Sequence, residues 1–539
     1  MKPLYRSADI RAIEHAAAAA LPEGELMRRA GRAAAAAAQR LLSSAAPHPG
    51  PVDTFPDRAS ALQRLQVRVL VLAGPGNNLG DALEAAAHLA DAGISVTVLH
   101  SQPGNAQSPE RAAAWRRAAD SSARFEELSA PAVQTGDWQL VIDGLFGIGL
   151  ARPIGGALRA LVDAVNQLPC PVLALDVPSG LDADTGAIVG PDGIALRASH
   201  TITFIGDKPG LHTNEGRDHA GIVEVAHLDI DPALLPTAEL QLNRLELFAR
   251  YLHARRHSGH KGTYGNVAVI GGATGMRGAP ILSARAALHA GAGRVYVLFP
   301  EDPLAADSGQ PELMCRLAEG YDFEQATLAI GPGLGDSATA ADLLARAIVS
   351  QSALLVDADA LNLLAHTPAL QRARASRGAT TAPTLHALQA ARPVDGSVTA
   401  VLTPHPLEAA RLLAVTVAAV QADRVAAART LAARLQAVVV LKGSGTVIAA
   451  PGGDCVINPT GNPALATAGT GDVLSGLCAA LLAQGCPPWP AALAAVWLHG
   501  AAADELVASG VGPIGMTAGE LIPAIRAGIN RLARLNLVR

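Results

Sequence analysis

The chain has 539 residues, of which 50% are hydrophobic and 17% charged, and its formal net charge is -5. This composition excludes a disordered chain, and the length predicts two or three well-buried domains. Lysine and arginine are scattered rather than gathered into a basic stripe, so we expect no nucleic-acid partner.

The cysteines and the N-terminus indicate where the chain works. The chain has five cysteines, Cys170, Cys315, Cys455, Cys478 and Cys486. They form no C-x-x-C pair, which argues against a disulfide framework and a zinc knuckle. The N-terminal alanine runs are interrupted by glutamates and arginines, unlike a signal peptide. Because every long apolar stretch contains a turn or a charge, we expect no membrane span. These features predict a cytoplasmic protein.

The first half alternates strands and helices. After two N-terminal helices and a proline-rich loop, "VRVLVLAG" predicts a strand, "DALEAAAHLADAG" a helix and "ISVTVLH" a strand. The apolar runs "LVIDGLFG" and "PVLALDVPSG" each lead through an aspartate into a glycine-containing loop, as in buried parallel strands with function at their carboxyl ends. We predict a three-layer, Rossmann-like α/β domain over residues 1–230.

The second half repeats this alternation after a linker at residues 231–257. We predict strands in "GNVAVIGG", "RVYVLFP", "ATLAIGPGLG", "ALLVDADALNLL", "SVTAVLTPHP" and "AVVVLKGSGT", and a hairpin around Gly452-Gly453. A final helix has a capping-box pattern in Thr517 and Glu520. Residues 374–397 interrupt the pattern as a surface insertion. The result is a second three-layer α/β domain over residues 258–539.

The first glycine loop, "GPGNNLGD" at 74–81, has the context of a nucleotide site but not the dinucleotide fingerprint. Leu79 stands where G-x-G-x-x-G requires glycine, and the next strand ends in His100 instead of an acidic residue. A redox cofactor bound in the Rossmann manner is therefore not expected. The alternative is a tight turn without a ligand.

Oxygen-bearing side chains follow three of the predicted strands. Asn78, Asp143 and Ser179 all lie in loops after strands, where the carboxyl edge of the sheet brings them together as ligands for a simple cation. Asp176, which ends "VLALD", could act as an acid or base on a substrate at the same edge. An aspartate there could instead only cap a helix.

In the second half, "GNPALATAGTGDVLSG" at 461–476 combines an anion cradle with a carboxylate. Glycine-rich amides at the start of a helix favour phosphoryl oxygens, and Asp472 beside them can accept a proton from a substrate hydroxyl. "KGSGT" offers Lys442 and glycine amides to a nucleotide, although lysine-glycine turns are common. His405 lies in the proline-rich loop "TPHP". The metal-like spacing of His253, His257 and His260 we discount.

With these residues in place, the chain resembles the bifunctional NAD(P)H-hydrate repair enzymes, an epimerase fused to an ADP-dependent dehydratase of ribokinase-like fold. The first half of the resemblance rests on "GPGNNLGD", "DGLFGIGLARPI" and "LDVPSGLDADTG". The second half rests on "HKGTYGNVAVIGGATGMRGAPILSARAALHAGAG", "GPGLG", "DADALNLL", "TPHP", "LKGSGTVI" and "GNPALATAGTGDVLSG".

The resemblance implies a role for each matching residue in the epimerase half. Asn78, Asp143 and Ser179 would bind potassium, and Asp176 would be catalytic beside the altered nicotinamide ring. The hydrated dinucleotide, NADHX or NADPHX, would contact Asn77, Asn78, Leu79, Gly80, Asp81, Gly147, Ile148, Gly149, Leu150, Ala151, Arg152, Pro153 and Asp176.

In the dehydratase half, the resemblance implies that ADP, with magnesium, phosphorylates the hydroxyl of the hydrate, and that phosphate then leaves to restore the dihydronicotinamide. Asp472 would be the base. ADP or AMP would be held by Lys442, Gly443, Ser444, Gly445, Thr446 and Gly471, and the hydrate site would be lined by Ala279, Gly333, Gly335, His405 and Asp472. We expect a homo-oligomer.

Two departures from the family pattern lie in the first glycine loop, and two other functions remain open. Leu79 and Ala82 replace family glycines. If the first of these glycines has a positive φ, leucine strains the turn and weakens substrate binding by the epimerase half. One alternative is a kinase of the same fold acting on a hydroxymethylpyrimidine or a sugar. The other is a nucleotide-binding regulatory module in which one or both sites are inactive.

Overall fold

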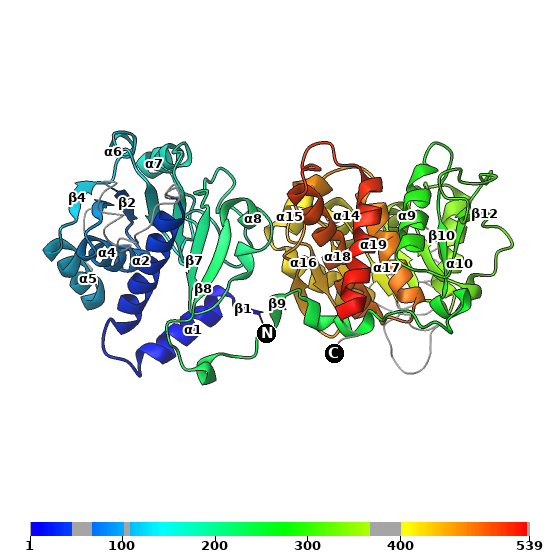
Figure 1. Ribbon diagram of the computed structural model, residues 1–539, viewed down its shortest axis with the longest axis horizontal. Helices are drawn as coiled ribbons and strands as arrows, with labels where there is room; N and C mark the ends of the chain where they lie inside the picture. The colour runs from blue at the N-terminus through cyan, green and yellow to red at the C-terminus, as the bar shows by residue number, and fades with distance from the viewer. Residues whose placement is uncertain (1, 46–66, 102–107, 367–399, 536–539) are drawn as a thin grey trace, which may run out of the picture. The chain divides into compact units, whose positions relative to one another are not determined.

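The computed structural model describes residues 2–45, 67–101, 108–366 and 400–535, and divides the chain into two compact units, 1–240 and 241–539 (Figure 1). Each unit is an α/β structure, so the predicted fold class is confirmed. The boundary falls inside the predicted linker 231–257. The predicted insertion at 374–397 lies outside the described residues.

The sheet of the first unit is parallel throughout. Its strand order is β4 (Arg124–Glu127), β3 (Ser95–His100), β2 (Arg68–Ala73), β5 (Leu140–Gly144), β6 (Val172–Leu175), β7 (His200–Phe204) and β8 (Ile222–Ala226). The predicted strands at "VRVLVLAG", "ISVTVLH", "LVIDGLFG" and "PVLALDVPSG" are confirmed. Strand β4 was not predicted, because "RFEE" is short and charged.

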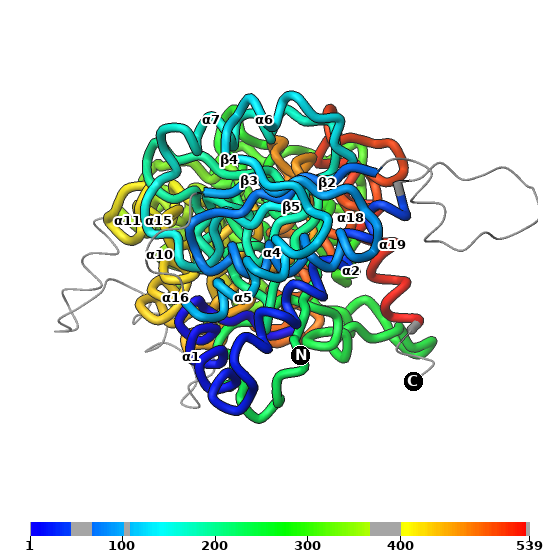
Figure 2. The backbone as a smooth tube through the Cα atoms, turned by 90° about the vertical axis from the view of Figure 1, so that its left-hand side faces the viewer, coloured from blue at the N-terminus to red at the C-terminus, as the bar shows by residue number. Residues whose placement is uncertain are grey.

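Helices cover both faces of this sheet, as Figure 2 shows with the first unit facing the viewer. Val69 and Val71 of β2 belong to a core cluster with residues of the helices on one face, whereas Leu70 and Leu72 belong to a cluster with α6 and α7 on the other. The helices are α1 (Ser7–Ala18), α2 (Glu25–Ala45), α4 (Asn78–Asp91), α5 (Pro109–Asp120), α6 (Ala130–Gln134), α7 (Gly156–Asn166) and α8 (Gly216–His219).

In the second unit, strands β9 to β18 form a mixed sheet. Its order is β9 (Leu240–Leu242), β18 (Cys455–Ile457), β17 (Val447–Ala449), β16 (Val438–Leu441), β15 (Ala400–Leu402), β14 (Leu354–Val356), β13 (Thr327–Ile330), β10 (Asn266–Ile270), β11 (Arg294–Phe299) and β12 (Met314–Leu317). The strands from β16 to β12 pair in parallel, and β17 pairs antiparallel with both β16 and β18. The predicted hairpin is therefore confirmed.

Two groups of helices enclose this second sheet. One group packs into a single hydrophobic core and lies together in Figure 1: α9 (Gly278–His289), α17 (Thr470–Ala483), α18 (Pro488–Ala508) and α19 (Ala518–Leu535). The other face carries α10 (Ala338–Val349), α11 (Ala358–His366), α14 (Pro406–Leu413), α15 (Val417–Ala422) and α16 (Arg424–Leu435). Thr517 and Glu520 meet before α19, where Thr517 Oγ1 donates to Glu520 Oε2 over 2.9 Å.

Helix α18 is long and apolar enough to cross a membrane by length and composition alone, which the sequence reading did not anticipate. In the structure 61% of its apolar window is buried, and residues such as Leu493 and Ala495 pack into the core of the second unit. A buried core helix meets the same criteria as a membrane span, so this helix alone does not indicate one.

Helices α9 and α17 approach each other closely at Gly476. A Cβ atom built at Gly476 would lie 1.8 Å from the carbonyl oxygen of Ser283, whereas a Cβ at Gly519 in α19 would meet no atom within 4 Å. Both glycines are helical, and neither has a positive φ. Substitution by alanine therefore has different effects at these two positions because of the space around the added methyl group, and not because of backbone strain.

We expect Gly476→Ala to destabilise the second unit by about 1–3 kcal/mol, because the added methyl group must push α9 and α17 apart. Gly519→Ala serves as the matched control, and it should stabilise α19 by up to about 1 kcal/mol through its higher helix propensity. Urea unfolding of the two variants measures both effects. Equal midpoints for the two variants would show that the helix contact does not limit stability.

Candidate active sites

Each sheet has a switch point, where neighbouring strands lead their chains to opposite sides. In the first unit this point lies between β2 and β5, because β3 and β4 extend to one side and β6 to β8 to the other. Loops that leave such strands diverge and open a crevice at the carboxyl edge. Asn78 follows β2, Asp143 lies at the end of β5, and Asp176 and Ser179 follow β6.

The structure brings Asn78, Asp143 and Ser179 together. Ser179 Oγ donates to Asp143 Oδ1 over 2.6 Å, and the Ser179 backbone N–H donates to Asp143 Oδ2 over 2.8 Å. The Asn78 amide nitrogen donates to the carbonyl oxygens of Phe146 and Leu175 over 3.2 and 3.0 Å. This orientation leaves Asn78 Oδ1 buried without a hydrogen-bond partner.

Asp143 is fully buried, and its burial raises its pKa to about 6, although the hydrogen bonds from Ser179 and Leu145 oppose the shift. No lysine or arginine contributes to this shift. The cluster thus combines a buried carboxyl group with an unsatisfied amide oxygen.

A cavity of about 510 Å³ opens beside this cluster. Its lining includes eight of the residues that the resemblance assigns to the dinucleotide: Asn77, Asn78, Asp81, Gly147, Ile148, Gly149, Leu150 and Asp176. Ala151, Arg152 and Pro153 are exposed and are not among the lining residues. Leu79 and Gly80 are buried and do not line the cavity either.

The expectation of strain at Leu79 is wrong. Leu79 lies in the first turn of α4, it is not among the residues with positive φ, and its side chain is 5% exposed in the hydrophobic core. Ala82, one turn later, is also buried in that core. Both side chains therefore stabilise the packing of α4 and do not distort the substrate loop.

Asp176 is paired with a lysine that sequence reasoning missed. The Lys208 side chain is fully buried, and its Nζ donates to Asp176 Oδ1 over 2.5 Å, to Thr203 Oγ1 over 2.7 Å and to the Phe204 carbonyl over 2.8 Å. Asp176 has a φ of 66°, a conformation that non-glycine residues adopt rarely. Lys208 lies in the motif "GDKPG", which does not indicate the pair because Lys208 comes 32 residues after Asp176 in the sequence.

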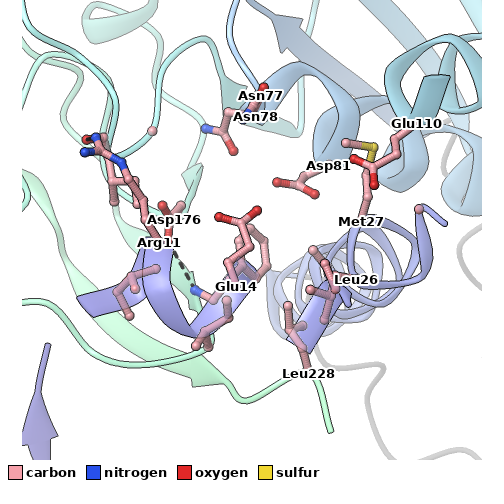
Figure 3. A pocket seen from close by; sticks show the side chains of 18 of the residues that line it. Arg11, Glu14, Leu26, Met27, Asn77, Asn78, Asp81, Glu110, Asp176 and Leu228 are labelled. Carbon is pink, nitrogen blue, oxygen red and sulfur yellow. Dashed lines mark hydrogen bonds between the residues drawn. The ribbon is translucent and has the colours of Figure 1, made fainter. Parts of the chain in front are cut away.

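Further carboxyl groups face the same cavity, as Figure 3 shows for Glu14, Asp81 and Glu110. Burial, reinforced by Asp176, Glu14 and Glu110, raises the pKa of Asp81 well above its usual value. Burial and the charges of Asp176 and Glu110 also raise the pKa of Glu14. The cavity therefore brings Asp176, paired with Lys208, close to carboxyl groups whose pKa values are raised.

In the second unit the switch point lies between β10 and β13, and the predicted hydrate-site residues of these loops meet there. A Cβ built at Gly333 would lie 3.3 Å from the Ala279 side chain. The Gly335 backbone N–H donates to Asp359 Oδ2 over 2.9 Å. Asp359 in turn is close enough to raise the pKa values of Glu408 and Asp472.

His405 caps helix α14 and is held on both ring nitrogens. Its Nδ1 accepts hydrogen bonds from the Leu407 and Glu408 backbone N–H groups over 3.1 and 3.3 Å, and its Nε2 lies 3.2 Å from Glu408 Oε1. Burial, with the charge of Lys442, lowers the pKa of His405. Because Nδ1 accepts two hydrogen bonds, it carries no proton in this arrangement, and the sequence did not reveal that Glu408 holds the ring.

Asp472 lies in the first turn of α17, close to a buried ion pair. Lys442 Nζ donates to Asp357 Oδ1 over 2.8 Å, and Ser475 Oγ donates to Asp357 Oδ2. Burial and the charge of Asp357 raise the pKa of Asp472 to about 6, although Lys442 opposes the shift. Burial likewise raises the pKa of Glu408 to about 7.

The turn Lys442–Thr446 follows β16, and a buried arginine holds its start through hydrogen bonds to backbone carbonyl oxygens. Arg424, 1% exposed, donates to the carbonyl oxygens of Leu441 and Lys442 over 3.2 and 3.1 Å. A Cβ at Gly443 would lie 2.8 Å from the guanidinium group, so only glycine fits there. A Cβ at Gly471 would be 3.5 Å from Lys442 Nζ, which brings this turn and α17 together.

The discounted histidine set does not form a metal site. Across the residues that the structure describes, there is no group of three or more His, Cys, Asp or Glu side chains placed to hold a metal ion. His260 Nδ1 instead accepts a hydrogen bond from the Gly262 backbone N–H over 3.1 Å.

Comparison with known proteins assigns both units. Residues 23–210 match the family described as YjeF-related protein N-terminus, and residues 267–381 and 382–526 match the family described as NAD(P)H-hydrate dehydratase. A bifunctional NAD(P)H-hydrate repair enzyme of Escherichia coli (strain K12) is 38% identical over 470 residues, 86% of this chain and 85% of that protein.

Two further proteins resemble the second unit. An ADP-dependent (S)-NAD(P)H-hydrate dehydratase of Neisseria meningitidis serogroup B is 41% identical over 312 residues, 56% of this chain and 99% of that protein. The solved structure of an ADP/ATP-dependent NAD(P)H-hydrate dehydratase from Bacillus subtilis, co-crystallized with ATP/Mg2+, is 30% identical, covers 54% of this chain and 98% of that chain, and has a TM-score of 0.44. With matches along both halves, the chain belongs to the bifunctional NAD(P)H-hydrate repair enzymes.

Proposed function

We propose that this chain repairs hydrated NADH and NADPH at its two switch points. The first unit interconverts the R and S epimers of NAD(P)HX, and the second dehydrates the S epimer at the expense of ADP, giving AMP and phosphate. The observation that carries the proposal is the position of Asp472, a half-buried carboxyl group beside the glycine-rich start of α17 and next to Lys442.

In the epimerase cavity, Asp176 and Asp81 have complementary roles. Epimerising a hydroxyl-bearing carbon next to the ring nitrogen breaks the C–O bond and re-forms it on the opposite face. The hydroxyl leaves as water after taking a proton, and the ring nitrogen shares the positive charge of the resulting iminium ion. Asp176, paired with Lys208, stabilises that charge, and Asp81 is the proton donor. The returning water gives its proton back to Asp81.

We expect Asp176→Asn to slow epimerisation by about 10²- to 10⁴-fold, because the amide cannot balance the positive ring. Lys208→Met should also slow it, since Asp176 then loses its partner. The control is Asp192→Asn, at an exposed position outside the cavity. Chiral separation of a NADHX epimer mixture measures the rate, and unchanged epimerisation in both cavity variants would remove Asp176 from the mechanism.

The Asn78 cluster fits a potassium ion. Asn78 Oδ1 is buried and unpaired, Asp143 supplies a carboxyl group, and Ser179 supplies a hydroxyl oxygen. Oxygen donors of this kind suit a hard cation. Potassium would be held by Asn78, Asp143 and Ser179, and it would supply fixed positive charge close to the dinucleotide. Asn78 and the Gly147 loop would orient the substrate beside it.

We expect potassium chloride to raise the melting temperature of the first unit above that measured in choline chloride of the same ionic strength. The cation satisfies Asn78 Oδ1, and binding to the folded state stabilises it. Asn78→Ala should remove this difference, whereas Asn166→Ala, which alters an amide on α7, should keep it. A wild-type melting temperature that does not distinguish the two salts would argue against a cation there.

In the dehydratase site, Asp472 accepts the proton of the hydrate hydroxyl while that oxygen attacks the terminal phosphorus of ADP. AMP leaves, and the C–O bond to the phosphate then breaks while the neighbouring ring CH2 group loses a proton, so that phosphate departs with that proton and the double bond of the dihydronicotinamide is restored. Magnesium would accompany the phosphates of ADP. Lys442 and the amides of Gly469 to Gly471 stabilise the transferring group, and the turn Lys442–Thr446 holds the nucleotide. His405, Ala279, Gly333 and Gly335 would line the hydrate site.

We expect Asp472→Asn to lower the dehydration rate by about 10²- to 10⁴-fold while ADP still binds. In the wild type, kcat should fall as the pH drops through about 6, because the raised pKa leaves Asp472 protonated and unable to accept a proton below that value. Absorbance of reduced nicotinamide together with AMP formation measures turnover.

Glu408→Gln tests which group controls this pH dependence, since the pKa of Glu408 is raised to about 7. The acid limb should remain near pH 6 in this variant. Its disappearance would assign the limb to Glu408, and near-normal turnover by Asp472→Asn would show that Asp472 is not the base.

The kinase alternative has less support, because the family matches along both units belong to hydrate repair. Incubation with hydrated NADH, ADP and magnesium separates the candidates, since only the repair enzyme regenerates NADH. The preference between ADP and ATP, the homo-oligomer and the cytoplasmic location stay predictions.

A further inference from the structure

The phosphate-binding loop of the second unit is held mainly by helix α18. The loop runs from the end of β18 at Ile457 to the start of α17 at Thr470, and it contains only the short 3-10 helix η7 (Pro463–Leu465). Gly461 and Gly469, near its ends, have φ values of 101° and 89°. A loop with so little regular structure needs other contacts to hold its amides in place.

The first contact is at Thr460. Its Oγ1 donates to the Trp497 carbonyl oxygen of α18 over 2.9 Å, and the Asn458 amide donates to the Thr460 carbonyl over 3.0 Å. A Cβ at Gly500, one turn further along α18, would lie 2.3 Å from Thr460 Oγ1. The loop therefore lies directly against the helix backbone.

The second contact is made by Asp504, two turns after Trp497 on the same helix. Its Oδ2 accepts the Gly461 backbone N–H over 2.9 Å, and its Oδ1 accepts the Asn462 amide over 2.8 Å. Asn462 Oδ1 then accepts the Ala464 backbone N–H over 3.0 Å and so caps η7. Hydrogen bonds to an ionised carboxylate are stronger than neutral ones, so this is the firmest attachment of the loop.

The third contact is at the catalytic end of the loop. His499 Nε2 lies 2.9 Å from the Thr470 carbonyl oxygen, which can only accept, so Nε2 carries the proton. Burial lowers the pKa of His499 to about 4, and the ring is neutral. Thr470 Oγ1 donates back to the Leu465 carbonyl over 2.9 Å. Thr470 lies between Gly469 and Gly471, whose amides face the transferring phosphate.

We propose that Asp504 is a positioning residue for the dehydratase reaction. Through Gly461 and Asn462 it fixes the loop whose other end carries Gly469 to Asp472. The inference rests on the proposed function of that loop in phosphoryl transfer.

Asp504 should affect turnover more than nucleotide binding. Its hydrogen bonds go to Gly461 and Asn462, whereas the turn Lys442–Thr446 is held by Arg424 and, at Thr446, by the Asn458 backbone N–H over 2.9 Å. Removing Asp504 therefore leaves the nucleotide turn in place but frees the amides that meet the transition state. Displacements of about 1 Å at a reacting centre can cost about 100-fold in rate.

The experiment compares Asp504→Ala with Glu505→Ala. Glu505 is the next residue on α18, exposed and paired with Arg531 instead of the loop. We expect Asp504→Ala to lower kcat for dehydration at least about tenfold with the KM for ADP little changed, and Glu505→Ala to match the wild type. Hydrogen exchange of the amides of residues 461–471 should accelerate only in Asp504→Ala.

The outcomes separate this inference from the proposed function. A purely structural role would lower the melting temperature but leave kcat per folded molecule unchanged, which would overturn the proposal. If the wild type does not dehydrate the hydrate, the proposed function fails, and unchanged exchange in Asp504→Ala would then refute the attachment itself.

Asn462→Ala is a second variant that removes the same attachment from the loop side. It should reproduce the loss of kcat and the faster exchange, and it decides the matter if Asp504→Ala does not fold. Wild-type kcat in Asn462→Ala, or an equal loss in Glu505→Ala, would contradict the inference.

Discussion

The central interaction of each site is an ion pair between one lysine and one of several neighbouring carboxyl groups. Lys208 pairs with Asp176 in the first unit, and Lys442 pairs with Asp357 in the second. In a water-poor crevice one cation can stabilise one ionised carboxylate, whereas further carboxyl groups nearby lose hydration without gaining a partner. Asp81 beside the first pair and Asp472 beside the second accordingly have raised pKa values.

The same arrangement serves different chemistry in the two units. In the first, Asp176 of the ion pair lines the cavity together with Asp81, whose pKa is raised, an arrangement that the proposed acid-assisted loss of water would use. In the second, the ionised Asp357 is enclosed by Lys442 and Ser475, and the carboxyl group with the raised pKa lies at the start of α17. A carboxylate of raised pKa is a stronger base once it is ionised, as proton removal from a hydroxyl requires.

The first turns of the helices α4 and α17, which begin at the two sites, also differ. Helix α4 begins at Asn78, so Asn78 and Asp81 lie in its first turn. Helix α17 begins at Thr470 after a glycine with positive φ, which leaves its first amides open to an anion. The Asp472 carboxylate would repel an anion bound at these amides. The positive charge of Lys442, which lies close to Gly471, offsets this repulsion. In the proposed reaction, Asp472 and the transferring phosphate would therefore share the charge of Lys442.

The sequence by itself determined the two α/β units, the strands that carry the site loops, and which polar residues lie at the carboxyl edges of those strands. Runs such as "VRVLVLAG" and motifs such as "AGTGD" are local, because strand burial and helix starts are encoded within a few neighbouring residues. Asn78, Asp143 and Ser179 lie at the same edge because strand ends in a parallel sheet share one edge, and Ser179 donates to Asp143 there.

Only the tertiary structure decided which charges meet. Lys208, Asp357, Glu408 and Arg424 carry no local signal of their partners, because an ion pair such as Asp357–Lys442 joins positions 85 residues apart. The expectation at Leu79 failed for the same reason: the family pattern gives the residue type, but the φ angle and the core contacts that accept a leucine are set by α4 and its neighbours. Local sequence fixes periodicity and turns, whereas electrostatic environment depends on packing between distant segments.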